Sequence, residues 1–383
     1  MQFIILMGFV SLFGDITYEG ARSITGPYLG FLGASAAMVG LIAGIGEFLG
    51  YALRMFSGFL ADRTKAYWPL TFLGYGLMFS IPLLAITNNW QLAAVFIILE
   101  RVGKAVRSPA RDTILSYATK QVGRGWGFGI HEAMDQIGAV LGPLVFTAAF
   151  LLKGGYRQGF TFLWIPAVLT IVVLIIARNK VPLPEKMEVD ADALGSEGKN
   201  SSKLPRIFWL YSLFTFLCVA GFANFALIGF HFSAKGVVPG AQIPLFYCIA
   251  MAVDGVAALI IGKVYDKIGL RSLILLPLLT IPIPFLAFSQ SYSFALVSVV
   301  LWGAVMGIHE TIMRAAIADL THINKRGFAY GVFNTIYGLA WFVGSAIMGL
   351  LYGTSIYHIC VFVIIMELIA LFVFFMVKKA RRS

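Results

Sequence analysis

Long apolar stretches separated by short polar breaks constrain this chain more than any other feature of its sequence. The approximate stretches are 3–30, 36–60, 69–87, 91–117, 127–152, 159–178, 206–231, 242–264, 272–289, 292–318, 329–352 and 355–377. A helix needs about 20 mostly apolar residues to cross a bilayer, and only helices or closed barrels satisfy their backbone groups in lipid. The stretches lack the alternation of barrel strands. We therefore predict an all-α integral membrane protein of twelve transmembrane helices.

The composition and charge fit the same interpretation. Hydrophobic residues make up 59% of the 383 positions and charged residues only 12%, whereas soluble domains carry roughly 25% charged residues. The net charge of +11 does not indicate nucleic-acid binding, because the basic residues gather in alternate loops. Cys218, Cys248 and Cys360 all lie within spans and lack metal-ligand or disulfide spacing. We expect no metal and no cofactor.

A single long polar segment divides the chain. Residues 179–205 are rich in Pro, Gly, Ser and charges, which is typical of a flexible linker, and six predicted spans lie on each side. We predict an N-terminal six-helix bundle over 1–178, a cytoplasmic linker, and a C-terminal six-helix bundle over 206–383 that ends in a short basic tail.

The distribution of Lys and Arg predicts the orientation. The loops on the linker's side of the membrane carry most of the basic residues, and the opposite loops carry only Lys153, Arg157 and Lys235. Because cytoplasmic loops are enriched in Lys and Arg, both termini are predicted to be cytoplasmic. The pattern fits a plasma (inner) membrane.

The two halves repeat one another. Gly58-Phe-Leu-Ala-Asp62-Arg63 follows the second span, and Gly262-Lys-Val-Tyr-Asp266-Lys267 follows the eighth. Arg111 in the fourth span aligns with Arg314 in the tenth. Parallel repeats of this kind predict two pseudo-symmetric bundles with one substrate site near the midplane between them.

These repeated loops resemble the G-x-L-a-D-R-x-G-R-K loop of the major facilitator superfamily. Gly58, Leu60, Asp62 and Arg63 match the first copy, and Lys65, Ala66 and Tyr67 depart from it. The second copy retains Gly262, Asp266, Lys267, Gly269 and Arg271. The resemblance implies the major facilitator fold, and it implies a role in the inward gate for Gly58, Asp62, Arg63, Gly262, Asp266 and Arg271.

Two further segments are similar to motifs of the same family. Glu100-Arg101-Val-Gly103-Lys104 partly matches its fourth-span arginine motif, with a shorter spacing from Arg to Gly. Gly138-Ala-Val-Leu-Gly142-Pro143 is similar to the G-x-x-x-G-P pattern of proton-coupled drug antiporters. The second match implies a gating role for Gly138, Gly142 and Pro143. Ordinary packing between helices is the alternative for the glycine pair.

Ionisable residues inside spans are costly and are functional-site hypotheses. The candidates for substrate or proton binding are Asp15, Glu19, Arg22, Glu47, Arg101, Glu132, Asp135, His309, Glu310 and Arg314. Asp15 and Glu19 are the preferred proton carriers, since both lie mid-span on one helix face. Mutual neutralisation is the structural alternative for Glu100 with Lys104 and for Glu310 with Arg314.

Two other features stay open between function and structure. His131 and His309 fit either proton relays or buried hydrogen-bonding residues. Asn334, Tyr337 and Trp341 share one face of the eleventh span, where they would line a cavity or pack against neighbouring helices.

The leading hypothesis is a secondary transporter working by alternating access: a proton-coupled antiporter that exports a small organic molecule, drug-like or amphiphilic. The alternative is a proton-coupled symporter that imports a charged metabolite. An anionic substrate would need the intramembrane bases Arg22, Arg54, Arg101, Lys104 and Arg314. No phosphate-binding G-x-x-x-x-G-K-[ST] motif occurs and the loops are short, so neither a pump nor an enzyme is expected. A non-transporting sensor is a third class.

The expected partners are a small-molecule substrate, protons and the lipid bilayer, with the chain as a monomer.

Overall fold

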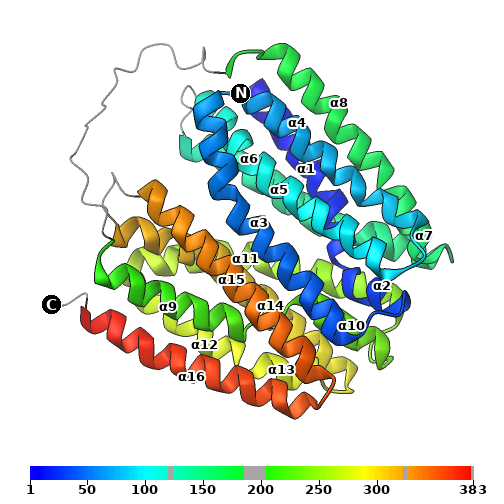
Figure 1. Ribbon diagram of the computed structural model, residues 1–383, viewed down its shortest axis with the longest axis vertical. Coiled ribbons are helices and arrows are strands. Elements are labelled where there is room, and N and C mark those ends of the chain that lie inside the picture. Colours follow the sequence, from blue (N-terminus) through cyan, green and yellow to red (C-terminus); the bar gives the residue numbers. More distant parts are fainter. Residues whose placement is uncertain (120–123, 185–203, 322–325, 381–383) are drawn as a thin grey trace. The chain divides into compact units, whose positions relative to one another are not determined.

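The computed structural model describes residues 1–119, 124–184, 204–321 and 326–380, which are helical apart from short connections (Figure 1). Its elements follow the predicted spans in order. They are α1 (Gln2–Arg22) with α2 (Thr25–Phe31), α3 (Ala36–Thr64), α4 (Tyr67–Leu77) with η1 (Met78–Ser80) and η2 (Pro82–Ile86), α5 (Trp90–Thr119), α6 (Arg124–Leu151), α7 (Gly155–Phe162) with α8 (Trp164–Lys180), α9 (Arg206–Gly221) with α10 (Phe225–Ala234), η4 (Gly240–Gln242) with α11 (Ile243–Ile268), η5 (Gly269–Ile274) with α12 (Leu275–Thr280) and α13 (Pro282–Ala287), α14 (Tyr292–Leu320), α15 (Arg326–Tyr352) and α16 (Ile356–Ala380).

The twelve-helix architecture is confirmed. Ten described stretches are long and apolar enough to cross a membrane, and the stretch at Gly240–Ala287 is 48 residues long because it holds two of the predicted spans. The remaining span is α5, which is less apolar than these stretches because it carries several charged residues between Glu100 and Arg111. This helix is therefore the one that most needs polar partners inside the protein.

Several spans predicted as continuous are interrupted, which corrects the sequence-based boundaries. The first span breaks after Arg22, because Pro27 has no N–H to donate to the carbonyl of Ser23. Pro82 and Pro282 stand at similar breaks in the third and ninth spans. The seventh span breaks at Phe222, and the side chain of Asn224 caps the helix that follows by accepting from the N–H of Ala226 at 2.9 Å.

The chain forms two compact units. Unit 1 contains Met1–Arg22 and Ala52–Lys199, and unit 2 contains Ser23–Tyr51 and Asn200–Ser383. Unit 2 thus includes α2 and the first part of α3 in addition to the helices that follow the linker. Most of the linker, 185–203, lies outside the described residues, and the division into bundles at 178 and 206 stays a prediction.

Unit 1 is built on close contact between α1 and α6. A Cβ atom at Gly138 would lie 2.8 Å from the Cβ of Asp15, and one at Gly142 would lie 2.7 Å from the backbone nitrogen of Gly20. Glycine allows this approach because it has no side chain. Elsewhere in unit 1, α4 packs along α5 and α8 packs along α1 (Figure 1).

Unit 2 centres on α9, which packs against α15 and α16, while α11 packs along α14. At the break after α9, Trp302 donates from its indole nitrogen to the carbonyl oxygen of Ala223 at 2.9 Å. The ring of Phe222 stacks on Trp302 at 5.3 Å between centroids. Aromatic side chains therefore fix the non-helical segment inside the unit.

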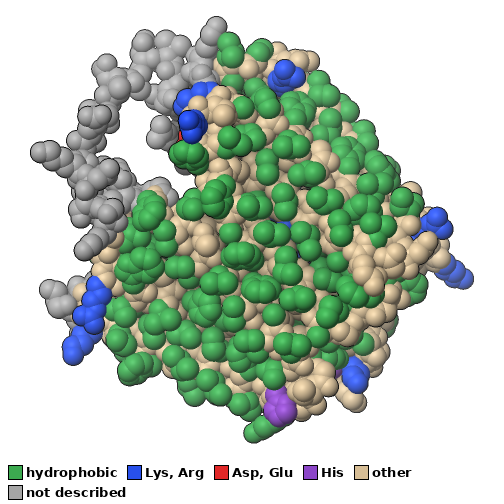
Figure 2. Space-filling view, viewed as in Figure 1, with side chains coloured by type: hydrophobic (Ala, Val, Ile, Leu, Met, Phe, Trp, Pro, Cys, Tyr) green, Lys and Arg blue, Asp and Glu red, His purple; other side chains and the backbone are tan. Residues whose placement is uncertain are grey.

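Large apolar side chains are exposed along most helices. Figure 2 shows hydrophobic side chains over most of the face in view, with Lys and Arg near its edges. Phe56, Leu259 and Phe372 are each more than half exposed. A surface of this kind is suited to contact with lipid rather than with water.

The contact between α1 and α6 gives a first prediction. Gly142→Ala should lower the free energy of unfolding by about 1–3 kcal/mol, because the added methyl group would meet backbone atoms that cannot rotate away. The matched control is Gly58→Ala, whose Cβ would lie an ordinary 3.5 Å from Pro109. Thermal unfolding of the purified proteins in detergent measures both, and equal melting temperatures for the two variants would contradict the packing described.

Candidate functional site

Unit 1 buries two carboxylates of α1 in its interior. The exposed fraction is 7% for Asp15 and 5% for Glu19. The Glu19 carboxylate lies 3.3 Å from the guanidinium of Arg22, one helical turn later. Both acids lie inside unit 1 rather than on its surface, and their predicted role as proton carriers stays a prediction.

Lys104 and Arg107 bring positive charge from α5 to the same helix. The ammonium group of Lys104 donates to the hydroxyl of Tyr18 at 2.6 Å, in the turn between the two acids. The guanidinium of Arg107 lies 5.5 Å from the ring centroid of Tyr18 and 4.7 Å from that of Tyr75. Cation–π contacts of this kind are strongest when the cation is removed from water.

Glu100 compensates the charge of Arg107. Its carboxylate lies 3.9 Å from Arg107 and 3.4 Å from the Nε atom of Arg101. Glu100 and Arg107 are each only 2% exposed. Among the described residues, the Nε and Nη1 atoms of Arg107 make no hydrogen bond. Charge and aromatic rings, rather than hydrogen bonds, therefore hold this part of Arg107.

A third cluster joins α1, α5 and α6. Arg111 donates to the hydroxyl of Ser11 at 2.8 Å, lies 2.9 Å from the carboxylate of Asp112, and approaches Asp135 at 4.0 Å. The Nδ1 atom of His131 lies 3.7 Å from the same carboxylate of Asp135. Asp135, predicted as a binding residue, is thus placed between a histidine and an arginine.

The other predicted residues are distributed differently. Glu47 is buried in the part of α3 that belongs to unit 2, and Glu132 is exposed on α6. Arg314 lies on α14, and its side chain is outside the described part of the chain. Their roles stay predictions.

The predicted gating residues at the loops are mostly exposed. The exposed side chains are those of Asp62, Arg63, Asp266 and Arg271. Close helix approach is not found at the loop glycines, since Cβ atoms at Gly58 and Gly262 would find ordinary contacts at 3.5 and 3.7 Å. The close contacts occur instead at Gly138 and Gly142, the glycine pair of α6.

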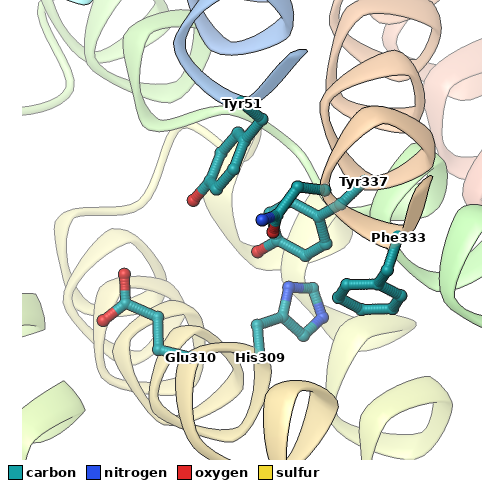
Figure 3. Close-up of a pocket in the computed structure, with 6 residues that line it drawn as sticks. Tyr51, His309, Glu310, Phe333 and Tyr337 are labelled. Atoms are coloured by element: carbon teal, nitrogen blue, oxygen red, sulfur yellow. The ribbon is translucent and has the colours of Figure 1, made fainter. Parts of the chain in front are cut away.

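Unit 2 contains a pocket made from three helices. Tyr51 reaches in from α3, His309 and Glu310 from α14, and Phe333, Asn334 and Tyr337 from α15 (Figure 3). The rings of Tyr51 and Tyr337 meet edge to face at 4.8 Å. The cavity has a volume of about 10 Å³, which is room for about one water molecule, so a larger ligand would require the lining side chains to move apart.

His309 is the unusual member of this pocket. It is only 1% exposed, its ring lies 5.0 Å from that of Phe222, and neither ring nitrogen has a hydrogen-bond partner among the described residues. Buried polar groups normally have partners, because an unmade hydrogen bond costs about 1–3 kcal/mol. A ligand or water in the pocket would supply one.

Sequence reasoning missed part of both sites. Tyr18, Tyr51 and Phe333 were not selected, because one aromatic among many in apolar spans has no distinguishing pattern. For the polar face of the eleventh span, the two alternatives were lining a cavity and packing against other helices. Asn334 and Tyr337 line the pocket, whereas Trp341 is 1% exposed and packs against Phe222 at 5.6 Å. Glu367 was also missed, although an acidic residue in the most apolar span could have been recognised from the sequence as a candidate functional residue.

The fold and these sites agree with the comparison to known families. The sequence profile described as Major Facilitator Superfamily matches residues 4–253 and 230–383, so this chain belongs to that superfamily. It is a membrane transporter and not an enzyme. The predicted family is thereby confirmed.

Relatives by sequence include one described as a transporter of the same superfamily. An uncharacterized protein of Mycobacterium tuberculosis is 40% identical, covering 99% of this chain and 94% of the relative. An uncharacterized MFS-type transporter of Methanocaldococcus jannaschii is 27% identical, covering 91% and 88%. A class E tetracycline resistance protein of Escherichia coli is 32% identical over 170 residues, covering 44% of this chain and 38% of the relative.

Solved structures of transporters share the fold. A peptide transporter, POT, in complex with sulfate has a TM-score of 0.76 at 16% identity, covering 100% of this chain and 94% of that one. The nucleoside transporter NupG has a TM-score of 0.74 at 13% identity, covering all of both chains. At these identities the similarity concerns the fold alone.

The buried network of α5 gives a second prediction. Arg107→Met should lower the free energy of unfolding by about 3–5 kcal/mol, because Glu100 would keep its buried charge with less compensation. The double variant Glu100→Gln/Arg107→Met should lose less than the sum of the single variants, which a double-mutant cycle of unfolding measures. The control Arg157→Met removes an exposed arginine and should stay within about 0.5 kcal/mol of the wild type. Additive losses would contradict a coupled pair.

Proposed function

We propose that this transporter is a proton-coupled antiporter that exports a small organic molecule, drug-like or amphiphilic, by alternating access. The observation that carries the proposal is the pocket of unit 2, which is lined both by aromatic rings and by Glu310. Aromatic faces and a carboxylate attract an organic cation together, since the rings stabilise its charge and its apolar body. Protonation of Glu310 would remove the attraction between its carboxylate and the cation.

The buried acids of unit 1 support the proton as coupling ion. Asp15 and Glu19 lie in an interior where a carboxylate is costly, and Lys104 is held nearby through Tyr18. Loss or gain of a proton in this cluster changes which charges are compensated. We infer that Asp15 and Glu19 exchange the coupling proton, with Asp135 as a further candidate.

The partial similarity to a tetracycline resistance protein favours an organic molecule as the substrate. Because that similarity covers less than half of each chain, it leaves the particular substrate open. The close contact of α1 with α6 at Gly138 and Gly142 would let α1 move against α6 during the transport cycle.

The second candidate is a proton-coupled symporter that imports a charged metabolite. The buried bases Lys104 and Arg107 favour it, since an anionic substrate needs cations inside the membrane. The direction of substrate flux under an imposed proton gradient separates the two candidates.

The proposed setting is the plasma (inner) membrane, with a monomer whose termini are both cytoplasmic. A green fluorescent protein joined after Ser383 should fluoresce in the cytoplasm, and alkaline phosphatase inserted at Lys153 should be active outside it. The opposite pair of signals would reverse the predicted orientation.

Transport in proteoliposomes tests the function. With ethidium as the cationic aromatic probe and uridine and dialanine as neutral and zwitterionic ones, ethidium should move against an imposed proton gradient. Glu310→Gln should weaken ethidium binding about tenfold, a loss of about 1.4 kcal/mol. Asp15→Asn should abolish uptake driven by the gradient and retain exchange of ethidium for ethidium, because binding survives without coupling.

The control variant is Asp319→Asn, which removes an exposed carboxylate that accepts from the hydroxyl of Tyr265, outside the pocket and outside the clusters of α1, α5 and α6. It should retain coupled transport. Intact coupled transport in both Asp15→Asn and Glu310→Gln would refute the assignment, and substrate moving together with protons would favour the symporter.

A further inference from the structure

Glu367 is a carboxyl group that the proposed transport sites do not use. It lies in the middle of α16, the most apolar of the candidate spans, and its exposed fraction is 0%. Neither carboxyl oxygen has a hydrogen bond of regular geometry among the described residues, and the neighbouring thiol of Cys218 is only a weak donor. A group so costly to bury in a membrane helix is a functional-site hypothesis in its own right.

The neighbours of Glu367 belong to the last turn of α9. A Cβ atom at Gly221 would lie 2.6 Å from its Oε1 atom, and the thiol of Cys218 lies beside the carboxyl. A helix ends in unpaired carbonyl groups that carry partial negative charge, which disfavours an anion there. This site therefore favours the neutral acid or a carboxyl group that has bound a cation.

No described base offsets a charge on Glu367. The elements packed against α16 are α9, α12, α13, α15 and η5, and their described basic side chains are those of Arg206 and Arg271, both exposed. On α16 itself, His358 is bonded to Thr354 near the start of the helix, and Lys378 and Lys379 lie in its last turn. An uncompensated buried charge would cost several kcal/mol, so ionisation of Glu367 requires the interface to change.

The broken segment after α9 links Glu367 to the pocket. Gly221 touches the carboxyl group, and the next residue, Phe222, packs its ring against His309 at 5.0 Å. Phe222 also contacts Trp302 and Trp341, at 5.3 and 5.6 Å. Non-helical backbone inside a membrane protein is where coupling ions and substrates are commonly bound.

We propose that Glu367 is a second proton-binding site of this transporter, and that its proton controls the pocket through Phe222. With the proton bound, α9 packs closely on α16 and Phe222 stays against His309. On release, the O–H bond of the carboxyl breaks, the proton passes to water that enters at the broken segment, and the carboxylate repels the carbonyl end of α9. Phe222 then moves and alters the pocket. The link to transport rests on the proposed function.

The test needs no substrate. Wild type, Glu367→Gln, Glu310→Gln and the double variant Asp15→Asn/Glu19→Gln are reconstituted in lipid nanodiscs, and infrared difference spectra and tryptophan emission are recorded against pH. The wild type, Glu310→Gln and the double variant, which lacks the two acids of α1, should share one carboxylic acid C=O band that disappears as pH rises. Glu367→Gln should lack that band. Tryptophan emission should change at the same midpoint in the wild type, because Phe222 contacts two tryptophans, and this change should be lost in Glu367→Gln.

Phe222→Leu separates protonation from its consequence. It should retain the infrared band and lose the change in tryptophan emission. Cys218→Ser, which alters the nearest titratable neighbour, should shift the midpoint of the band, and it supplies a second readout in case Glu367→Gln does not fold. The proposal would be overturned if the band shared with Asp15→Asn/Glu19→Gln persisted in Glu367→Gln or never titrated. It would also be overturned if the pH-dependent change in emission were still present in Glu367→Gln and Phe222→Leu. None of these outcomes depends on ethidium transport, so the two proposals fail separately.

Discussion

The cost of a charge in lipid is the constraint on which the rest of this structure depends. The fourth span, α5, carries more charged residues than an isolated transmembrane helix tolerates, so its side chains must be compensated by other helices. Lys104 donates to the hydroxyl of Tyr18. Arg107 lies against two aromatic rings and near Glu100. Arg111 donates to Ser11 and pairs with Asp112. These contacts also require α1 to be close, and the glycines of α6 make room for it.

The two units use different polar chemistry. In unit 1 acids and bases lie near one another on α1, α5 and α6, which suits exchange of a proton because each change of charge has a neighbour to respond. In unit 2 the pocket combines aromatic rings with Glu310, Asn334 and a histidine whose nitrogens lack described partners. Such a surface suits recognition of an organic molecule. A transporter that couples the two needs both kinds of site, which is the physical basis of the antiporter proposal.

Breaks in the helices lie where the proposed chemistry is found. The non-helical residues between α9 and α10 leave backbone groups that the helix ladder cannot satisfy, and Trp302 and Asn224 satisfy two of them. A segment held by a few side-chain contacts can move more readily than a continuous helix. Because this segment lies between Glu367 and His309, a change of charge at Glu367 can move it and thereby alter the pocket at His309.

The sequence by itself determined the solvent, the number of spans and the family. Those properties depend on length, hydropathy and local motifs, which are written along the chain. It also identified Asp15, Glu19, His309 and Glu310 as candidates, since an ionisable residue in an apolar stretch is conspicuous. Only the tertiary structure decided which residues meet: that Tyr51 joins Tyr337, that Gly138 and Gly142 rather than Gly58 mediate close contact, and that Glu367 lies beside Gly221. Contacts between distant segments depend on how side chains pack in three dimensions, and no local pattern encodes that packing.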